Sequence, residues 1–395
     1  MAEVNIQALL DGLAAELGAP VALDDVDFRL LAHTAHSDGI DEVRRSWIMD
    51  RLLPEDVRQW LERQHVREAV GPVRTPAEPL LGVAFPRWCV PVRFRGMHFG
   101  FVWVLESNPI PEDRLGPALV AAEQIGVISF RQRLLAQADR DLLRLLLIPS
   151  TGSESVSSAE ALSIHPHKGP IAVAVVGATG GGGLDARALS DLEIAMQRAA
   201  EQASSESVLA GVISGLGVLL APLRSREDML PARRLAESAL RLAAYFSDGG
   251  QFFAAIGGAT SLQRASRSYA ESLRALRIVR AMPKQFGPIA AWDDLGVFRP
   301  LTLLPPSEME SVLDPRIRAL LSNENLAATA EVFLELAGNV QETAGRLHLH
   351  RTALYHRLDR IAALYELDLR RNGDDRLLTH LGLKLARLRS SEAAV

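Results

Sequence analysis

The residues best suited to bind another macromolecule lie between Asn339 and Arg360. Asn339 with Glu342 predicts a capping box, and the apolar stripe that follows breaks around Leu349 before it resumes. This pattern predicts two short helices that cross at a tight turn, with the small Ala344 at their close approach. Polar and basic side chains remain on the face away from the leucines. They are Gln341, Arg351, Thr352, Tyr355, His356, Arg357 and Arg360.

The exposed face of this helix pair fits double-stranded DNA. Donors at the start of the second helix, Arg351 and Thr352, are the expected readers of base edges in the major groove. Arg357 and Arg360 lie further along and are the expected phosphate contacts. The stretch holds four arginines against two acidic residues, a local charge of +2 in a chain whose net charge is −5. The alternative is a helical hairpin whose charges are merely solvated.

A second candidate binding site is the glycine-rich stretch Gly177–Gly183, which follows a predicted strand and precedes a predicted helix. Glycines in such a turn let the backbone approach a pyrophosphate, so a nucleotide-dependent enzyme is an alternative function. The next predicted strand ends at Ile213-Ser214 without an acidic residue for a ribose hydroxyl. Because no nucleophile, base and orienting acid can be assembled, we expect no enzymatic activity, no catalytic residues, no metal and no cofactor.

Tryptophans gather near the start of the chain, where four of the five lie within residues 1–115. Bulky apolar side chains line small-molecule pockets. We therefore expect Trp47, Trp88 and Trp103 to line an effector pocket, with ordinary core packing as the alternative.

The first two predicted parts are a mixed domain and a long helix. Residues 1–115 open with a helix that stops at Gly18 and continue with alternating strands, including a hairpin around Arg95-Gly96, which predicts an antiparallel sheet. Residues 116–148 keep helical spacing and predict a connecting helix. Its apolar surface exceeds what one neighbouring domain can cover, so we expect pairing with a second copy through positions such as Leu135 and Leu142.

The remaining parts follow a polar stretch. Residues 149–164 are rich in serine and predict a linker. Residues 165–300 predict the order βαββαβα, an α+β sandwich with helices on one face of its sheet. Residues 315–395 are almost entirely helical by pattern and contain the two crossing helices.

Composition limits the class of protein further. At roughly 100–200 residues per domain, 395 residues predict more than one domain. The net charge of −5 excludes a basic coat that binds nucleic acid over the whole surface. The single cysteine, Cys89, cannot form an intrachain disulfide, and no signal segment opens the chain, so we expect a cytoplasmic protein. No apolar run approaches the roughly 20 residues of a membrane helix, so no membrane partner is expected.

The stretch Gly338–Leu358 is similar to the C-terminal helix-turn-helix of PucR/CdaR-type bacterial transcription regulators. The similarity continues through Ile361, Leu364 and the run Leu367-Asp368-Leu369, and then through Asp375-Arg376-Leu377. Where the family more often has His-Arg-Asn-Thr-Leu, this chain has His350-Arg351-Thr352-Ala353-Leu354. The base contacts expected of that asparagine are therefore not implied here.

Upstream, the chain resembles two further domains of such regulators. Residues 165–300 are similar to a degenerate GGDEF-like domain through Ala254–Gly258, Ser266 to Ser268 and the helix Ala270–Arg280. A cyclase would carry its acidic signature where this chain has Ser214–Gly217, so we expect no cyclase activity. Residues 1–115 resemble a GAF-type sensor domain in Leu13–Leu23 and Trp88–Leu105.

The whole pattern predicts a multidomain α+β fold. Its parts are an antiparallel-sheet, GAF-like sensor domain, a long connecting helix for dimerisation, a βαββαβα GGDEF-like domain and an all-α helix-turn-helix domain. The resemblance implies a cytoplasmic transcription regulator that binds double-stranded DNA as a homodimer or higher homo-oligomer. An unknown small-molecule effector, or a partner, is expected to act on the N-terminal domain.

Overall fold

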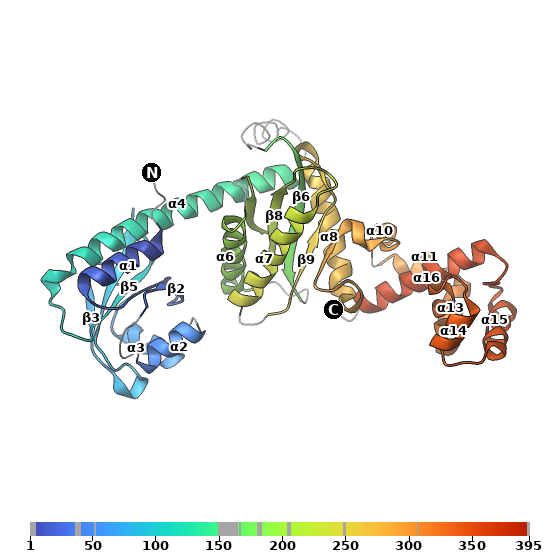
Figure 1. Ribbon diagram of the computed structural model, residues 1–395, viewed down its shortest axis with the longest axis horizontal. Coiled ribbons are helices and arrows are strands. Elements are labelled where there is room, and N and C mark those ends of the chain that lie inside the picture. Colours follow the sequence, from blue (N-terminus) through green and yellow to red (C-terminus); the bar gives the residue numbers. More distant parts are fainter. Residues whose placement is uncertain are drawn as a thin grey trace. The chain divides into compact units, whose positions relative to one another are not determined.

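The computed structural model has a mixed α+β fold with antiparallel sheets, a long helix and a helical C-terminal region, which confirms the predicted fold class (Figure 1). It describes residues 5–35, 41–50, 53–148, 165, 167–179, 184–203, 207–247, 250–305 and 307–392. Residues 1–135 and residues 136–395 form two compact units. Within the described ranges, no helix combines the length and the apolar character that crossing a bilayer requires.

The first unit is built on a five-stranded antiparallel sheet in the order β2-β1-β5-β4-β3. Its strands are β1 (Val21–Asp24), β2 (Leu30–His33), β3 (Val73–Thr75), β4 (Arg87–Phe94) and β5 (Met97–Leu105). Its helices are α1 (Ile6–Leu17), α2 (Glu42–Asp50), α3 (Glu55–Arg63) and the first part of α4 (Gly116–Leu147), with 3-10 turns η1 (Pro79–Leu81) and η2 (Glu112–Leu115). The predicted hairpin is confirmed, because β4 and β5 pair around Arg95 and Gly96, whose φ angles of 48° and 78° make the tight turn.

Alternate residues of this sheet pack on opposite faces, as the period of two along a strand requires. Val90 and Val102 pack against α1 and α4 on one face. Cys89 and Phe101, their neighbours in sequence, pack against α2 and α3 on the other. Figure 1 shows these two helix pairs on either side of the sheet. The first unit therefore has two separate cores.

The second unit begins with a sheet in the order β11-β9-β6-β8-β7, with β10 paired to β6. Its strands are β6 (Pro170–Ala178), β7 (Leu209–Ile213), β8 (Leu216–Pro222), β9 (Phe252–Ile256), β10 (Thr260–Ser261) and β11 (Ile289–Ala291). Its helices are α6 (Ala186–Glu201), α7 (Leu230–Phe246), α8 (Ala265–Ala281) and α9 (Pro283–Phe286), with 3-10 turns η3 (Leu262–Arg264) and η4 (Trp292–Leu295). The predicted order βαββαβα is confirmed except for two short strands that were not predicted, namely β10 between β9 and α8, and β11, which pairs parallel to β9.

The prediction that the helices of this sheet lie on one face is wrong. Helices α6 and α7 cover one face, whereas α8 and the end of α4, through Leu143 and Leu147, cover the other. The reason is visible in β6, whose residues Ile171–Val176 are apolar at every position and all buried. A strand without polar alternation must be covered on both faces.

Helix α8 approaches the sheet closely at the end of β9. The Gly257 N–H donates to the Val173 carbonyl (2.8 Å), and the Val173 N–H donates to Ser268 Oγ (2.9 Å). A Cβ atom on Gly257 would lie 1.9 Å from the Ser268 carbonyl oxygen, so this approach requires glycine. The two features that resembled a GGDEF-like domain, Ala254–Gly258 and Ser266 to Ser268, thus meet at one packing point.

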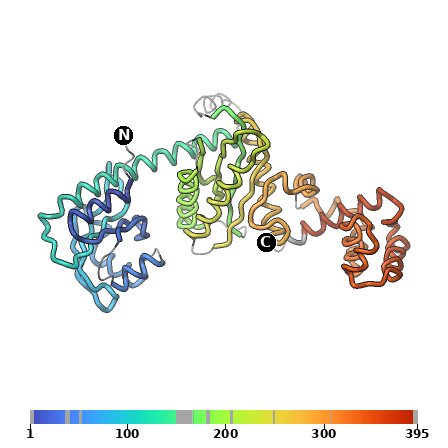
Figure 2. The backbone as a smooth tube through the Cα atoms, viewed as in Figure 1, coloured from blue at the N-terminus to red at the C-terminus, as the bar shows by residue number. Residues whose placement is uncertain are grey.

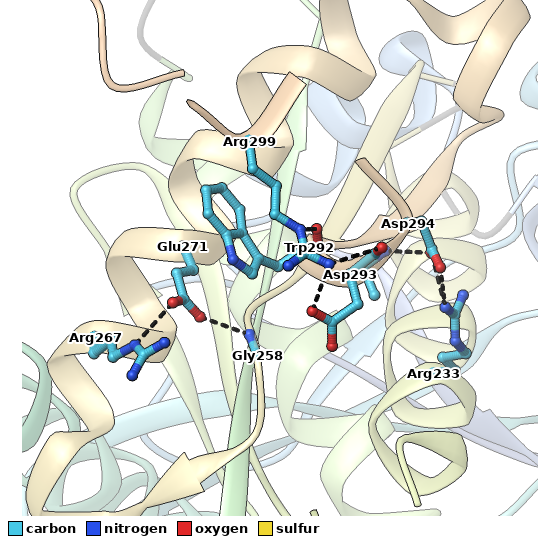
Figure 3. A network of polar contacts seen from close by, with 9 residues as sticks. Arg233, Gly258, Arg267, Glu271, Trp292, Asp293, Asp294 and Arg299 are labelled. Atoms are coloured by element: carbon cyan, nitrogen blue, oxygen red, sulfur yellow. Dashed lines mark hydrogen bonds and ion pairs between the residues drawn. The ribbon is translucent and has the colours of Figure 1, made fainter. Parts of the chain in front are cut away.

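A polar network continues from this point (Figure 3). The Gly258 N–H donates to Glu271 Oε2 (2.9 Å), and Glu271 also pairs with Arg267. Nearby, Asp294 accepts two hydrogen bonds from Arg233 on α7 (2.7 and 2.8 Å). The first contacts join α8 to the segment after β9, and the second join α7 to η4.

The C-terminal region is helical, as predicted. It consists of α10 (Phe298–Leu301), α11 (Met309–Val312), α12 (Pro315–Leu321), α13 (Glu324–Glu335), α14 (Val340–Arg346), α15 (Arg351–Tyr365) and α16 (Gly373–Glu392). The backbone trace shows α16 running back from α13–α15 toward α8 (Figure 2), which it contacts. One apolar core extends from the α8 face of the sheet, for example Leu276, into these helices, for example Leu388.

Candidate nucleic-acid interface

The entry to α14 is fixed by left-handed residues and a side-chain cap. Ala337 and Gly338 have φ angles of 53° and 84°, which end α13 as predicted for Gly338. Asn339 Oδ1 then accepts hydrogen bonds from the N–H groups of Gln341 (3.1 Å) and Glu342 (3.2 Å). The predicted capping box is half formed, because the Asn339 N–H donates to the Leu336 carbonyl (2.9 Å) instead of to Glu342.

A tight turn joins α14 to α15. The Leu349 N–H donates to the Ala344 carbonyl (2.8 Å), and His348 takes a φ angle of 53°. Ala344 is buried where α14 meets its neighbours, so the predicted role of a small residue at the crossing is supported. His350 caps α15, and its Nδ1 accepts from the Thr352 N–H (3.4 Å). Backbone and cap contacts thus set the direction in which α15 leaves the turn.

The inner face of α15 is held by the core. Leu354, Leu358 and Ile361 are all buried and belong to the same cluster as Phe333 of α13. Because these three residues recur at helical spacing, the opposite face of α15 must be in solvent. The helix is therefore anchored along its length with one face free to meet a ligand.

Six of the seven predicted DNA-binding residues are exposed. They are Gln341 on α14 and Arg351, Thr352, Tyr355, His356 and Arg360 on α15. Tyr355 is 41% exposed, and Arg370 lies over its ring with its guanidinium carbon 5.4 Å from the centroid. Hydrogen-bond donors and an aromatic ring on one exposed helix face are the groups that read base edges in a major groove.

Arg357 differs from the other six residues. It is half-buried, and its Nη1 donates to Thr329 Oγ1 on α13 (3.1 Å). A guanidinium held against a neighbouring helix braces the domain, so the geometry supports a structural role in place of the predicted phosphate contact. Its spacing from Leu354 and Ile361 places Arg357 beside the buried face of α15, but the residue on α13 that accepts the hydrogen bond is distant in the chain and could not be predicted.

Arg370 lies in the loop after α15 and was not predicted from the sequence. Arg370 forms an ion pair with Asp359 and so neutralises the acidic residue that α15 carries beside the exposed donors. Asp368 fixes this loop, because its Oδ1 accepts from the N–H groups of Arg370 (3.0 Å) and Arg371 (3.1 Å). The Asp-x-Arg spacing is the sequence signal that could have placed Arg370 here.

The two acidic residues of the family motif act together. Asp375 at the start of α16 accepts from the Asp368 N–H through Oδ2 (2.9 Å) and lies 3.5 Å from Arg316 on α12. Arg316 also binds Asp314, and this hydrogen bond holds the pKa of the Asp314 carboxyl below its usual value. The motif therefore ties α12, the loop after α15 and α16 into one unit beneath the exposed face.

The glycine-rich alternative lacks the architecture it needs. Strand β6, which ends just before this stretch, lies between β8 and β9 and is antiparallel to both. A dinucleotide-binding turn requires a parallel βαβ unit, so the nucleotide-dependent enzyme is not supported. Residues 180–183 lie outside the described residues. The turn at Ser214 and Gly215, with φ angles of 50° and 78°, is a two-residue hairpin without a carboxylate.

The structure brings together two of the three tryptophans predicted to line one pocket. Trp47 and Trp103 have ring centroids 6.3 Å apart, on the face covered by α2 and α3. Trp88 packs on the opposite face and donates to the Ile110 carbonyl (2.9 Å). Directly paired residues on neighbouring strands share a face of the sheet, and Trp103 pairs with Cys89. Trp88, next to Cys89 in β4, therefore lies on the other face, and the three tryptophans cannot share a pocket. Trp60 on α3, the fourth tryptophan of this segment, lies with Trp47 but was not among the three predicted pocket residues.

Comparison with known proteins identifies two parts of the chain. Residues 326–385 match the family described as PucR C-terminal helix-turn-helix domain, and residues 149–278 match the family described as GGDEF-like domain. The resemblance predicted from the sequence is confirmed for these two parts. The second match begins at residue 149, so it includes the predicted linker 149–164, which lies outside the described residues.

Relatives match the chain over most of its length. The DNA-binding transcriptional activator AdeR of Bacillus subtilis (strain 168) is 24% identical, over 96% of this chain and 93% of that protein. The proline-responsive transcriptional activator PutR of the same organism is 20% identical, over 92% of each. A crystal structure of a regulator of polyketide synthase expression from Bifidobacterium adolescentis aligns with 19% identity and a TM-score of 0.31, covering 64% of this chain and 99% of that one.

Proposed function

We propose that this DNA-binding transcription regulator of the PucR type works as a homodimer or higher homo-oligomer whose N-terminal domain responds to a small-molecule effector. The observation that carries the proposal is the exposed face at the start of α15, where Arg351 and Thr352 precede Tyr355 and His356. In a helix-turn-helix, the N-terminal residues of the second helix contact base edges in the major groove. Double-stranded DNA is therefore the proposed partner, and the bacterial cytoplasm the proposed compartment.

Dimerisation is proposed through residues 120–134 of α4. Val120, Val127 and Leu134 are 56%, 43% and 55% exposed and recur every seven residues, so they supply one of the two apolar positions of a heptad seam. The seam differs from the predicted one, because Leu142 packs against the core of the second unit. A second copy of the chain is the proposed occupant, since paired helix-turn-helix units bind two half-sites and one unit alone covers little DNA.

Effector control is proposed for the first unit. One relative is named as a proline-responsive activator, which supports a small-molecule signal for this chain as well. The antiparallel sheet with separate cores on its two faces is consistent with the proposed GAF-like identity. We expect the GGDEF-like domain to transmit or support regulation without making a cyclic dinucleotide.

DNA binding can be tested without a known operator. Sites would be selected from a pool of random double-stranded fragments, and the full chain titrated against the best site by fluorescence anisotropy at several salt concentrations. Each phosphate contact contributes about −0.9 to the slope of log affinity against log salt, so a steep slope is expected. Arg241→Ala, which removes an exposed arginine on α7, is the matched control and should bind normally. Failure to enrich any site, with no salt dependence, would refute the proposal.

A further inference from the structure

The first unit has a small pocket between its sheet and α3. It is lined by the indole rings of Trp47, Trp60 and Trp103, by aliphatic side chains and by Arg87. Its empty space is about 240 Å³ when the open mouth is included. The enclosed part holds about one water molecule, so a ligand must be small and must use the mouth. Indole rings beside a cation are typical of a site for a compact molecule that is apolar at one end and charged at the other; here the Trp47 and Trp103 rings meet edge to face.

One buried arginine, Arg87, lines this pocket, and a second, Arg44, is close enough to interact with its charge. Arg87 is 5% exposed and forms an ion pair with Asp41 at 2.5 Å. Arg44 is 1% exposed, and its Nη2 donates to the Val21 carbonyl (2.9 Å). The Nε groups of both arginines are buried and have no hydrogen-bond partner in the described part of the chain. Both guanidinium groups therefore retain unused donors.

The surroundings do not balance this charge. Asp41 is the carboxylate that faces the pair, and it also accepts from the N–H groups of Arg44 (3.0 Å) and Ala84 (3.2 Å). Burial and the charge of Arg87 lower the pKa of Arg44 to about 10, so Arg44 remains a cation near neutral pH. Two buried cations thus face one carboxylate.

Asp24 is the second buried carboxyl on this face of the sheet. Burial raises the pKa of Asp24 well above its usual value, which favours its neutral form. Its oxygens are already used, because Oδ2 accepts from Trp103 Nε1 (2.8 Å) and Oδ1 from the Phe101 N–H (3.1 Å). Asp24 therefore holds Trp103 in place and leaves the positive charge of the arginines uncompensated.

We infer that this pocket binds a small organic monocarboxylate, with the carboxylate at Arg87 and a compact apolar body against Trp47, Trp60 and Trp103. An uncompensated buried cation is costly, and an anionic ligand would remove that cost. The indole rings would shield the apolar body from water. The inference rests on the proposed effector control and gives its ligand a chemical class. Free carboxylic acids and amino acids share this chemistry and are separated by the test.

The probes are three molecules of matched shape, namely isovalerate, L-valine and neutral isovaleramide. Each would be titrated into the full-length protein while tryptophan fluorescence and thermal unfolding are followed, with sodium chloride as the ionic-strength control. A carboxylate probe should bind saturably and raise the unfolding temperature of the first unit, because a ligand of the folded state stabilises it. Isovaleramide should bind at least tenfold more weakly. Tighter binding of L-valine than of isovalerate would assign the ligand to the amino acids.

Arg44→Met is the decisive variant. It removes the surplus charge without removing a residue that lines the pocket, and Val21 O keeps its hydrogen bonds from Thr34. The variant should fold at least as stably as the parent and bind the carboxylate probes at least tenfold more weakly. Arg45→Met, at an exposed position on the same helix, should bind as the parent does.

Equal binding of isovaleramide and the carboxylates, undiminished binding by Arg44→Met, or binding of no probe would overturn the inference. A DNA titration on the same preparation separates this failure from failure of the proposed function. Normal DNA binding without carboxylate binding would overturn only the ligand assignment. Carboxylate binding without DNA binding would overturn the proposed function as a DNA-binding regulator.

Discussion

Replacing Arg351 by alanine tests the DNA-binding face most directly. Arg351 is the first residue of α15 and is exposed. In the described part of the chain its side chain makes no hydrogen bond or ion pair with another residue. An exposed substitution of this kind changes the free energy of unfolding by no more than about 0.5 kcal/mol. Any larger effect on DNA affinity is therefore an effect on the contact itself.

The expected loss of affinity follows from the geometry of base recognition. A bidentate contact between an arginine and a base edge is worth about 1–3 kcal/mol, which corresponds to a rise in Kd of about 5- to 150-fold. The loss should appear on the selected site and be much smaller on a scrambled site, because a base contact carries sequence preference. Anisotropy titrations of both DNAs measure the two changes.

Arg357→Ala is the matched comparison on the same helix. It removes the hydrogen bond to Thr329 Oγ1, so we expect the free energy of unfolding to fall by about 0.5–1.5 kcal/mol, as measured by urea denaturation. The affinity of the folded protein should change little. Unchanged affinity of Arg351→Ala on the selected site would refute the assignment of the α15 start. A uniform loss of affinity in Arg357→Ala, with full stability, would restore the phosphate role of Arg357.

Three further predictions concern the other domains. Replacing both Val127 and Leu134 by aspartate should convert the dimer to a monomer in light scattering, because unpaired charges buried in a seam cost roughly several kcal/mol. The control Gln132→Asp should stay dimeric, and a dimeric double variant would exclude this seam. Incubation with GTP and magnesium should yield no cyclic dinucleotide, since the Ser214–Gly217 turn lacks a carboxylate, and product above a heat-killed control would contradict this. Burial raises the folded-state pKa of Asp24, so the contribution of this carboxyl to stability is full below its unfolded-state pKa of about 4 and is lost as the pH rises through its folded-state pKa. Urea unfolding followed by tryptophan fluorescence should show this decline in stability, and Asp24→Asn should flatten the pH dependence.

Local features of the DNA-binding region were predictable because they depend on neighbours in the chain. Asn339 caps the helix that follows it, and Gly338 takes a left-handed conformation. The leucines and Ile361 recur at helical spacing, which fixed the inner face of α15 and left its polar face outside. The hairpin at Arg95-Gly96 and the order of the βαββαβα strands and helices are equally local.

Contacts between distant segments were decided only by the tertiary structure. Strand periodicity alternates the tryptophans between two faces, but only the pairing of β4 with β5 put Trp103 with Trp47 and Trp88 on the other side. Arg357 lies three residues after Leu354 and four before Ile361, beside the buried face of α15, but only the fold shows that Thr329 on another helix holds its side chain inward. Arg87 and Asp41 are likewise distant in the chain, and only the fold brings them together beside Arg44. A sequence states each residue's own charge and polarity, whereas burial and partners depend on chain segments that only folding brings within hydrogen-bond distance.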